Sequence, residues 1–190
     1  MRLFIAADLT VQQKKEVSAF QRRLSTYLEG VKWVREEGLH LTLKFLGEVD
    51  PGRIADLEAA MAAVAEEISP FQMRCGGVGV FPPSGRARVI WAGLQEGAAE
   101  LAKTAATLEK KLLCRGFPRS DRPFKPHLTL GRVRDPLPEQ VIRRFILQES
   151  SFLSSPALID AITLYQSNLT PQGAFYKALR RYYLTENAGK

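Results

Sequence analysis

The chain contains two copies of a segment that reads as a strand, an acidic turn with proline, and a helix. HLTLKFLGEVDPGRIADL begins at His40, and HLTLGRVRDPLPEQVI begins at His127. The copies lie too far apart in the sequence for the short period of a solenoid repeat. Two similar lobes related by an approximate twofold axis would explain the two copies. This repeat restricts the possible folds of the chain more than any other feature of the sequence.

The rest of the chain mixes strands with helices and hairpins. Helical spacing of apolar residues predicts helices over 11–28, 51–68, 101–112 and 141–147, the first capped by Thr10. Strands are predicted over 2–7, 31–34, 39–49, 71–81, 89–94, 128–133, 157–166 and 174–184, with a turn at 170–173. Gly76, Gly77 and Gly79 indicate a bulge or a close backbone approach. This order predicts an α+β fold of mainly antiparallel sheet, and because no linker divides the chain, residues 1–190 are expected to form a single bilobal domain.

Composition and charge favour an anionic partner. Lys and Arg number 27 against 20 Asp and Glu, which gives a net charge of +7. The electrostatic field of this positive charge attracts nucleic acid, although a generally basic surface explains the charge equally well. Cys75 and Cys114 have no metal or disulfide pattern, the start lacks the features of a signal peptide, and no apolar run could span a bilayer. These features predict a cytoplasmic protein without a membrane partner.

The two HLTL motifs hold both histidines of the chain. Side chains of a strand alternate between its faces, so His40 and Thr42 share one face while the leucines pack into the core. The same holds for His127 and Thr129. A single histidine in a strand is usually structural, and duplication could preserve the pattern without function. The pair is nevertheless the strongest functional signal in the sequence, because no other position carries histidine.

Two imidazoles and two hydroxyls suit phosphodiester hydrolysis. Histidine titrates near pH 6.5, so one ring can accept a proton from water while the other protonates the leaving oxygen. The threonine hydroxyls can donate to phosphate oxygens. Walker, G-x-S-x-G and H-x-E patterns are absent from the sequence, and we expect neither a metal nor a cofactor.

Basic residues near the motifs are candidates for phosphate contacts. Lys44 lies two residues beyond Thr42 and is expected to share its face, where a phosphate contact and a solvated lysine are equally plausible. Arg132 lies five residues beyond His127, on the opposite face unless the strand bulges. The stretch 119–134 is strongly basic and includes Phe124, which suits a polynucleotide strand, or else an exposed loop with a core phenylalanine.

The sequence resembles the 2H phosphoesterase superfamily, whose signature is a pair of H-x-T motifs (HXTX). Its flanking segments are similar to the RNA 2′,3′-cyclic phosphodiesterase branch, historically called 2′-5′ RNA ligase. The matching segments are RLFIAADL, WVREEGLHLTLKFLGEV, GVGVFPPSGRARVIWAGL, FKPHLTLGRV and LYQSNLTPQGAFY, which together span nearly the whole chain.

The resemblance implies a bilobal fold with outer helices and a central cleft that holds both motifs. It implies a hydrolase that opens the cyclic phosphate at an RNA end to a 2′-phosphomonoester without metal, with possible ATP-independent ligation. By family position, His40 would protonate the leaving 3′-oxygen and His127 would accept a proton from water. Thr42 and Thr129 would hold phosphate oxygens, and Arg132 would assist them.

Other functions remain open at this point. The chain could be a non-catalytic RNA-binding module, which would not need two complete H-x-T motifs. It could instead act on small cyclic nucleotides or on 2′-5′ oligonucleotides, against which the basic stretch before His127 argues weakly. The sequence implies no obligate protein partner.

Overall fold

The computed structural model describes residues 1–170 and 173–186, in which it has four α-helices, two short 3-10 helices and nine strands. In chain order these are β1 (Arg2–Asp8), α1 (Val11–Ser25), β2 (Val31–Trp33), η1 (Glu36–Gly38), β3 (His40–Glu48), η2 (Pro51–Arg53), α2 (Ile54–Glu67), β4 (Phe71–Phe81), β5 (Val89–Glu96), α3 (Ala98–Leu113), β6 (Leu128–Val133), α4 (Glu139–Glu149), β7 (Ala157–Ile159), β8 (Ala161–Thr170) and β9 (Gly173–Tyr183).

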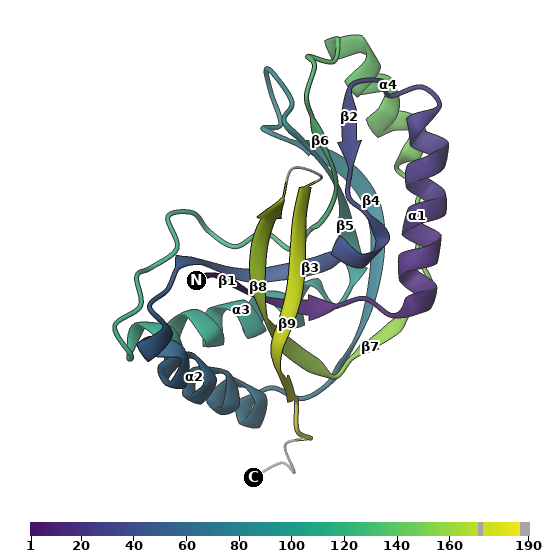
Figure 1. Cartoon of the computed structure of the whole chain (residues 1–190). Coiled ribbons are helices and arrows are strands. Elements are labelled where there is room, and N and C mark those ends of the chain that lie inside the picture. Colours follow the sequence, from purple (N-terminus) through teal and green to yellow (C-terminus); the bar gives the residue numbers. More distant parts are fainter. Residues whose placement is uncertain (171–172, 187–190) are drawn as a thin grey trace.

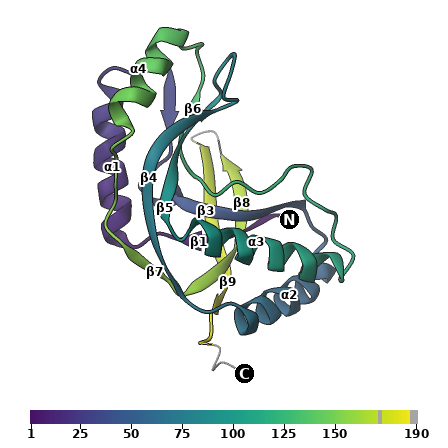
Figure 2. The same ribbon diagram turned by 180° about the vertical axis from the view of Figure 1, so that it is seen from behind.

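The strands form two antiparallel sheets. The first has the order β3-β1-β8-β9, and the second has the order β2-β6-β5-β4-β7. Helices α2 and α3 lie on one side of the molecule and α1 and α4 on the other, with the sheets between them (Figures 1 and 2). The predicted α+β fold with outer helices is therefore confirmed.

The twofold repeat is visible in the strand order. The order β3-β1-β8 in the first sheet corresponds to β6-β5-β4 in the second. In each sheet the H-x-T strand pairs with a strand that leads into a helix: β3 pairs with β1, which precedes α1, and β6 pairs with β5, which precedes α3. Each sheet also takes two strands from the other half of the chain: β8 and β9 enter the first sheet, and β2 and β4 enter the second. The two lobes are thus interlocked, and neither corresponds to one continuous segment.

The core follows from side-chain alternation in the motif strands. Leu41 and Leu43 of β3, and Leu128 and Leu130 of β6, are buried among the apolar faces of the helices. Each sheet therefore has a helix-covered face and an opposite face, here called the inner face, that carries the motif histidine and threonine. The predicted cap is also present, since the Thr10 hydroxyl accepts from Gln13 N.

Several element boundaries differ from the sequence prediction, and three of the differences have a clear cause. Helix α1 ends at Ser25 rather than at residue 28, because the next residues form a turn before Gly30, whose φ is positive. Pro51 opens η2, and α2 starts only at Ile54. The strand predicted over 157–166 is divided into β7 and β8, which belong to different sheets. The turn predicted at 170–173 includes residues 171–172, which lie outside the described residues.

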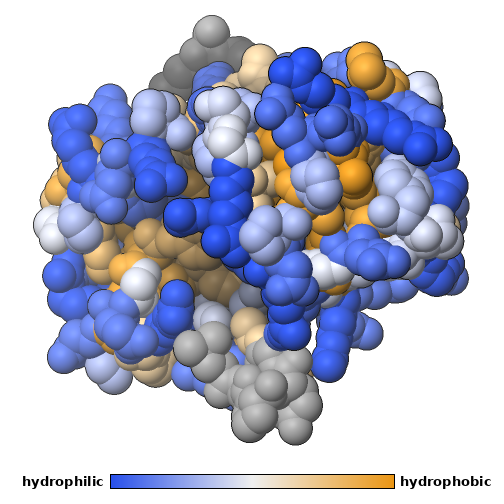
Figure 3. Space-filling model, turned by 90° about the horizontal axis from the view of Figure 1, so that it is seen from above, coloured by the Kyte–Doolittle hydropathy of each residue, from blue (hydrophilic) through white to orange (hydrophobic). Residues whose placement is uncertain are grey.

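The surface is mainly hydrophilic in the view from above, with apolar side chains in a hollow between the polar groups (Figure 3). Among the described residues, no helix is long and apolar enough to cross a membrane.

Candidate active site

His40 begins β3 and packs against a cluster of aromatic rings. Its imidazole stacks on Phe4 of β1 with ring centroids 4.8 Å apart, and Tyr176 of β9 meets it edge-on at 5.2 Å. Tyr165 of β8 also stacks on Phe4, with ring centroids 5.2 Å apart. These rings explain why Phe4, although on the inner face, is only 3% exposed.

This environment keeps His40 neutral. Burial lowers the pKa of His40 to about 4, against the opposing effects of the Asp8 carboxylate and of a hydrogen bond with the backbone of Gly38. Asp8 lies opposite His40 in the β1–β3 ladder and accepts hydrogen bonds from Thr163 Oγ1 at 2.8 Å and Tyr165 Oη at 2.6 Å. The carboxylate is therefore held in place by β8.

His127 directly precedes β6 and is fixed in orientation by the backbone. Its Nδ1 lies 2.7 Å from the carbonyl oxygen of Lys125. A carbonyl can only accept, so Nδ1 carries a proton and donates it. In the neutral ring the lone pair is then on Nε2, which is the atom free to meet a substrate. Both motif histidines are thus held by the backbone two residues upstream.

A second aromatic cluster lies beside His127. Phe81 of β4 meets the imidazole edge-on at 5.1 Å and contacts Trp91 of β5 at 5.2 Å. The indole lies across Gly79, where a Cβ would collide with the ring. The β4–β5 register shifts between Gly76 and Val78. Both predicted reasons for the glycines, a bulge and a close approach, are therefore confirmed.

The two motif strands belong to different sheets but approach each other, with Cα atoms of β3 and β6 within 8 Å. The segment that leads into β3 is hydrogen-bonded to β6, since Val34 N donates to Leu130 O at 2.9 Å. The buried Gln21 amide donates to both Val34 O and Leu130 O. These bonds fix the start of β3 relative to the second motif.

The family model described as LigT like Phosphoesterase matches residues 8–91 and 93–176, and each range contains one H-x-T motif. The chain belongs to the LigT-like phosphoesterases.

Relatives of this LigT-like phosphoesterase cover almost the whole chain. A protein of Archaeoglobus fulgidus named RNA 2′,3′-cyclic phosphodiesterase is 40% identical over 182 residues, which are 95% of this chain and 98% of that protein. A protein of the same name from Methanocaldococcus jannaschii is 32% identical, over 96% of this chain and 100% of its own length.

Solved structures agree with the fold. A Thermus thermophilus protein superposes with a TM-score of 0.81 at 29% identity, covering 97% of this chain and 98% of its own. E. coli LigT complexed with 3′-AMP gives a TM-score of 0.76 at 25% identity, with the same coverage.

Both motif strands of this LigT-like phosphoesterase bulge at the same place. The β1–β3 register shifts between Ile5 and Ala6, and the β5–β6 register shifts between Ile90 and Trp91, so one leucine in each motif strand has no partner in that ladder. A bulge exchanges the faces of the residues that follow it. The fifth residue after each histidine therefore returns to the inner face.

The bulge in β3 makes the prediction for Lys44 wrong. Lys44 pairs with Ile5 on the helix-covered side, not with the residues beside Thr42. Its Nζ donates to Glu109 Oε2 at 2.8 Å, Pro118 O at 2.8 Å and Ser120 Oγ at 3.0 Å. All three ammonium protons are used, so Lys44 joins β3 to α3 and to the segment before the second motif, and it is not a phosphate ligand.

The bulge in β6 places Arg132 on the inner face, the exception that the sequence allowed for. Arg132 pairs with Val89, and Thr129 pairs with Trp91 on the same face. The corresponding residue of the first motif is Phe45, which pairs with Phe4 and is 70% exposed. Sequence reasoning missed Phe45, although its equal offset from His40 was a usable signal. Phe124, by contrast, packs against the core.

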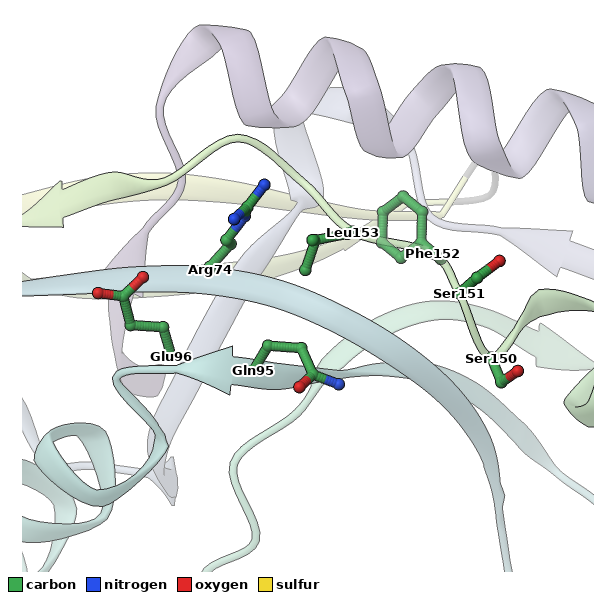
Figure 4. Close-up of a pocket in the computed structure, with 7 residues that line it drawn as sticks. All are labelled: Arg74, Gln95, Glu96, Ser150, Ser151, Phe152 and Leu153. Carbon is green, nitrogen blue, oxygen red and sulfur yellow. The ribbon is translucent and has the colours of Figure 1, made fainter.

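A large surface hollow lies away from the motifs. It has a volume of about 510 Å³ and is lined by residues of β4, β5 and the segment before β7, including Arg74, Glu96 and Phe152 (Figure 4). None of its lining residues belongs to either motif. Among the described residues, no group of three or more His, Cys, Asp or Glu side chains could hold a metal ion.

Proposed function

We propose that this LigT-like phosphoesterase hydrolyses the 2′,3′-cyclic phosphate at an RNA end to a 2′-phosphomonoester. The observation that carries the proposal is the pair of H-x-T strands, which approach each other from two sheets and each present an imidazole and a hydroxyl on the inner face. The relatives named RNA 2′,3′-cyclic phosphodiesterase support the same reaction.

His127 acts as the general base in this proposal. Its Nδ1–H donates to Lys125 O, so Nε2 of the neutral ring can accept a proton from the attacking water. The water oxygen bonds to phosphorus, and the bond from phosphorus to the ribose 3′-oxygen breaks in line. The phosphate stays on the 2′-oxygen.

His40 protonates the departing 3′-oxygen. Because burial lowers its pKa to about 4 in the free protein, His40 must take up a proton when substrate binds. The anionic phosphate would favour the charged ring, as the nearby Asp8 carboxylate does. Substrate binding and charging of the acid are therefore coupled.

The remaining contacts hold the substrate. Thr42 and Thr129 donate hydroxyl hydrogens to phosphate oxygens, and the Arg132 guanidinium neutralises the charge that develops on them. The exposed ring of Phe45, which contacts Phe4 beside His40, offers a face on which a base can stack. We assign the reaction to the cytoplasm, where the free Cys75 and Cys114 would stay reduced.

One assay tests the reaction. The protein is incubated with RNA that ends in a 2′,3′-cyclic phosphate, in excess EDTA, and the product is identified. A 2′-phosphate is expected. Lack of turnover would favour a binding module instead, EDTA sensitivity would exclude the metal-free route, and a 3′-phosphate would reverse the leaving group. Adding an RNA with a 5′-hydroxyl tests ATP-independent ligation.

A second assay separates the acid from the base. A nucleotide ester with a 4-nitrophenol leaving group needs little protonation of that group. We expect this substrate to restore most of the activity of His40→Ala but not that of His127→Ala. The opposite pattern would exchange the two roles.

A further inference from the structure

Two cations lie side by side on the inner face of the second sheet. Lys32 of β2 is directly opposite Arg132 of β6 in the antiparallel ladder, and both side chains are exposed. The neighbours of Lys32, Val31 and Trp33, pack against the core, and a Cβ at Gly131 would meet both of them. Lys32 and Arg132 therefore point away from the helices, toward the inner face.

This pair has no charge partner within the described part of the chain. Like charges placed directly opposite in a ladder are destabilising. None of the ion pairs found among residues 1–170 and 173–186 involves Lys32 or Arg132. Arg134 adds a third exposed cation near the pair. Its backbone N–H donates to Gly30 O, which continues the pairing of the two segments beyond the end of β6. Asp135, which follows it in the chain, lies against Gly30 and is in none of those ion pairs.

The position of Lys32 relative to the motif indicates what it binds. Arg132 shares the inner face with Thr129, while Lys32 lies one strand farther out, on the edge strand β2. Neighbouring strands are about 4.8 Å apart. With Arg132 beside Thr129 for the terminal phosphate, Lys32 is the cation on the outer side, available to an anion next to that phosphate. In a polynucleotide, the neighbouring anion is the phosphodiester of the preceding nucleotide.

We propose that Lys32, supported by Arg134, binds the phosphodiester immediately upstream of the cyclic phosphate. The enzyme then selects RNA ends with at least one internal phosphodiester over free cyclic nucleotides. This inference rests on the proposed function, because it takes the terminal phosphate to lie between the two motifs. It assigns substrate selection to the edge strand of the second sheet.

The test compares two substrates. Adenosine 2′,3′-cyclic phosphate has no upstream phosphodiester, and a short RNA with the same terminal nucleotide has several. For Lys32→Ala we expect kcat/KM to fall about tenfold on the RNA and to change less than about twofold on the mononucleotide. The slope of log kcat/KM against log salt on the RNA should become shallower by about 0.7, the value for one phosphate contact with a single strand.

Matched variants complete the design. Lys103→Ala removes an exposed lysine of α3 and should leave both substrates unaffected. Lys32→Arg should keep most of the activity on RNA. An equal fall on both substrates would place Lys32 at the terminal phosphate and refute the inference, as would no fall on RNA. A wild-type protein that hydrolyses neither substrate would instead refute the proposed function.

Discussion

The ion pair between the buried Lys44 and the partly exposed Glu109 should respond very differently to loss of its two members. The Lys44 side chain is 4% exposed, whereas that of Glu109 is 26% exposed. Removing one partner of a buried pair costs about 3–5 kcal/mol, because the remaining charge is left in a poorly solvated place. Glu109→Ala leaves the ammonium with only Pro118 O and Ser120 Oγ as acceptors, so we expect a loss of about 3 kcal/mol.

Lys44→Met should cost less. The Glu109 carboxylate would keep two hydrogen bonds from Ser120, donated by N at 2.7 Å and by Oγ at 3.0 Å, and it also contacts solvent. Methionine can fill the space of the lysine stem. We expect a loss of about 1 kcal/mol, since a partly solvated, hydrogen-bonded carboxylate tolerates the absence of its partner.

Urea unfolding measures both losses. With a slope of about 2 kcal/mol per M, the midpoint should fall by about 1.5 M in Glu109→Ala and by about 0.5 M in Lys44→Met. The double variant Lys44→Met/Glu109→Leu should return to within about 1 kcal/mol of the wild type, because no charge is left buried. Equal losses in the two single variants, or a larger loss in Lys44→Met, would refute this account of the pair.

Three further predictions concern the histidines and the interlocked lobes. His40→Ala and His127→Ala should each lower turnover on cyclic-phosphate RNA by at least about 10²-fold while the circular dichroism spectrum is unchanged; full activity in either variant would make that histidine structural. His40 has a folded pKa of about 4 and an unfolded value of about 6.5, so the unfolded chain binds more protons between these values. The free energy of unfolding should therefore fall by about 2–3 kcal/mol as the pH drops from about 7 to about 4.5, and His40→Gln should lose that part of the pH dependence in urea titrations. Because each sheet takes strands from both halves, we expect one unfolding transition with coincident fluorescence and circular dichroism curves; two separate transitions would contradict the single domain predicted from the sequence.

Much of the fold could be predicted from the chain because the relevant signals are local. Apolar spacing located the helices and most strands, and alternation in HLTL placed each histidine with its threonine and each leucine in the core. These patterns depend on neighbours a few residues apart, whose relative orientation is set by the geometry of a strand or helix. The repeated motif further indicated two similar lobes.

The surroundings of the site could not be read in the same way. The bulges in β3 and β6 reversed the predicted face of Lys44 and brought Arg132 and Phe45 to the inner face. A bulge depends on how two strands pair, so neither strand shows it alone. The aromatic cluster that buries His40 is likewise assembled from β1, β8 and β9.

The sequence by itself thus determined which groups are offered for the chemistry: two imidazoles and two hydroxyls on strand faces. The tertiary structure decided how those groups differ, with His40 buried against Phe4 and His127 held by Lys125 O. It also decided that Lys32 faces Arg132 across β2 and β6. The physical reason is that burial and cross-strand pairing arise between segments distant in the chain, whereas strand alternation arises within one segment.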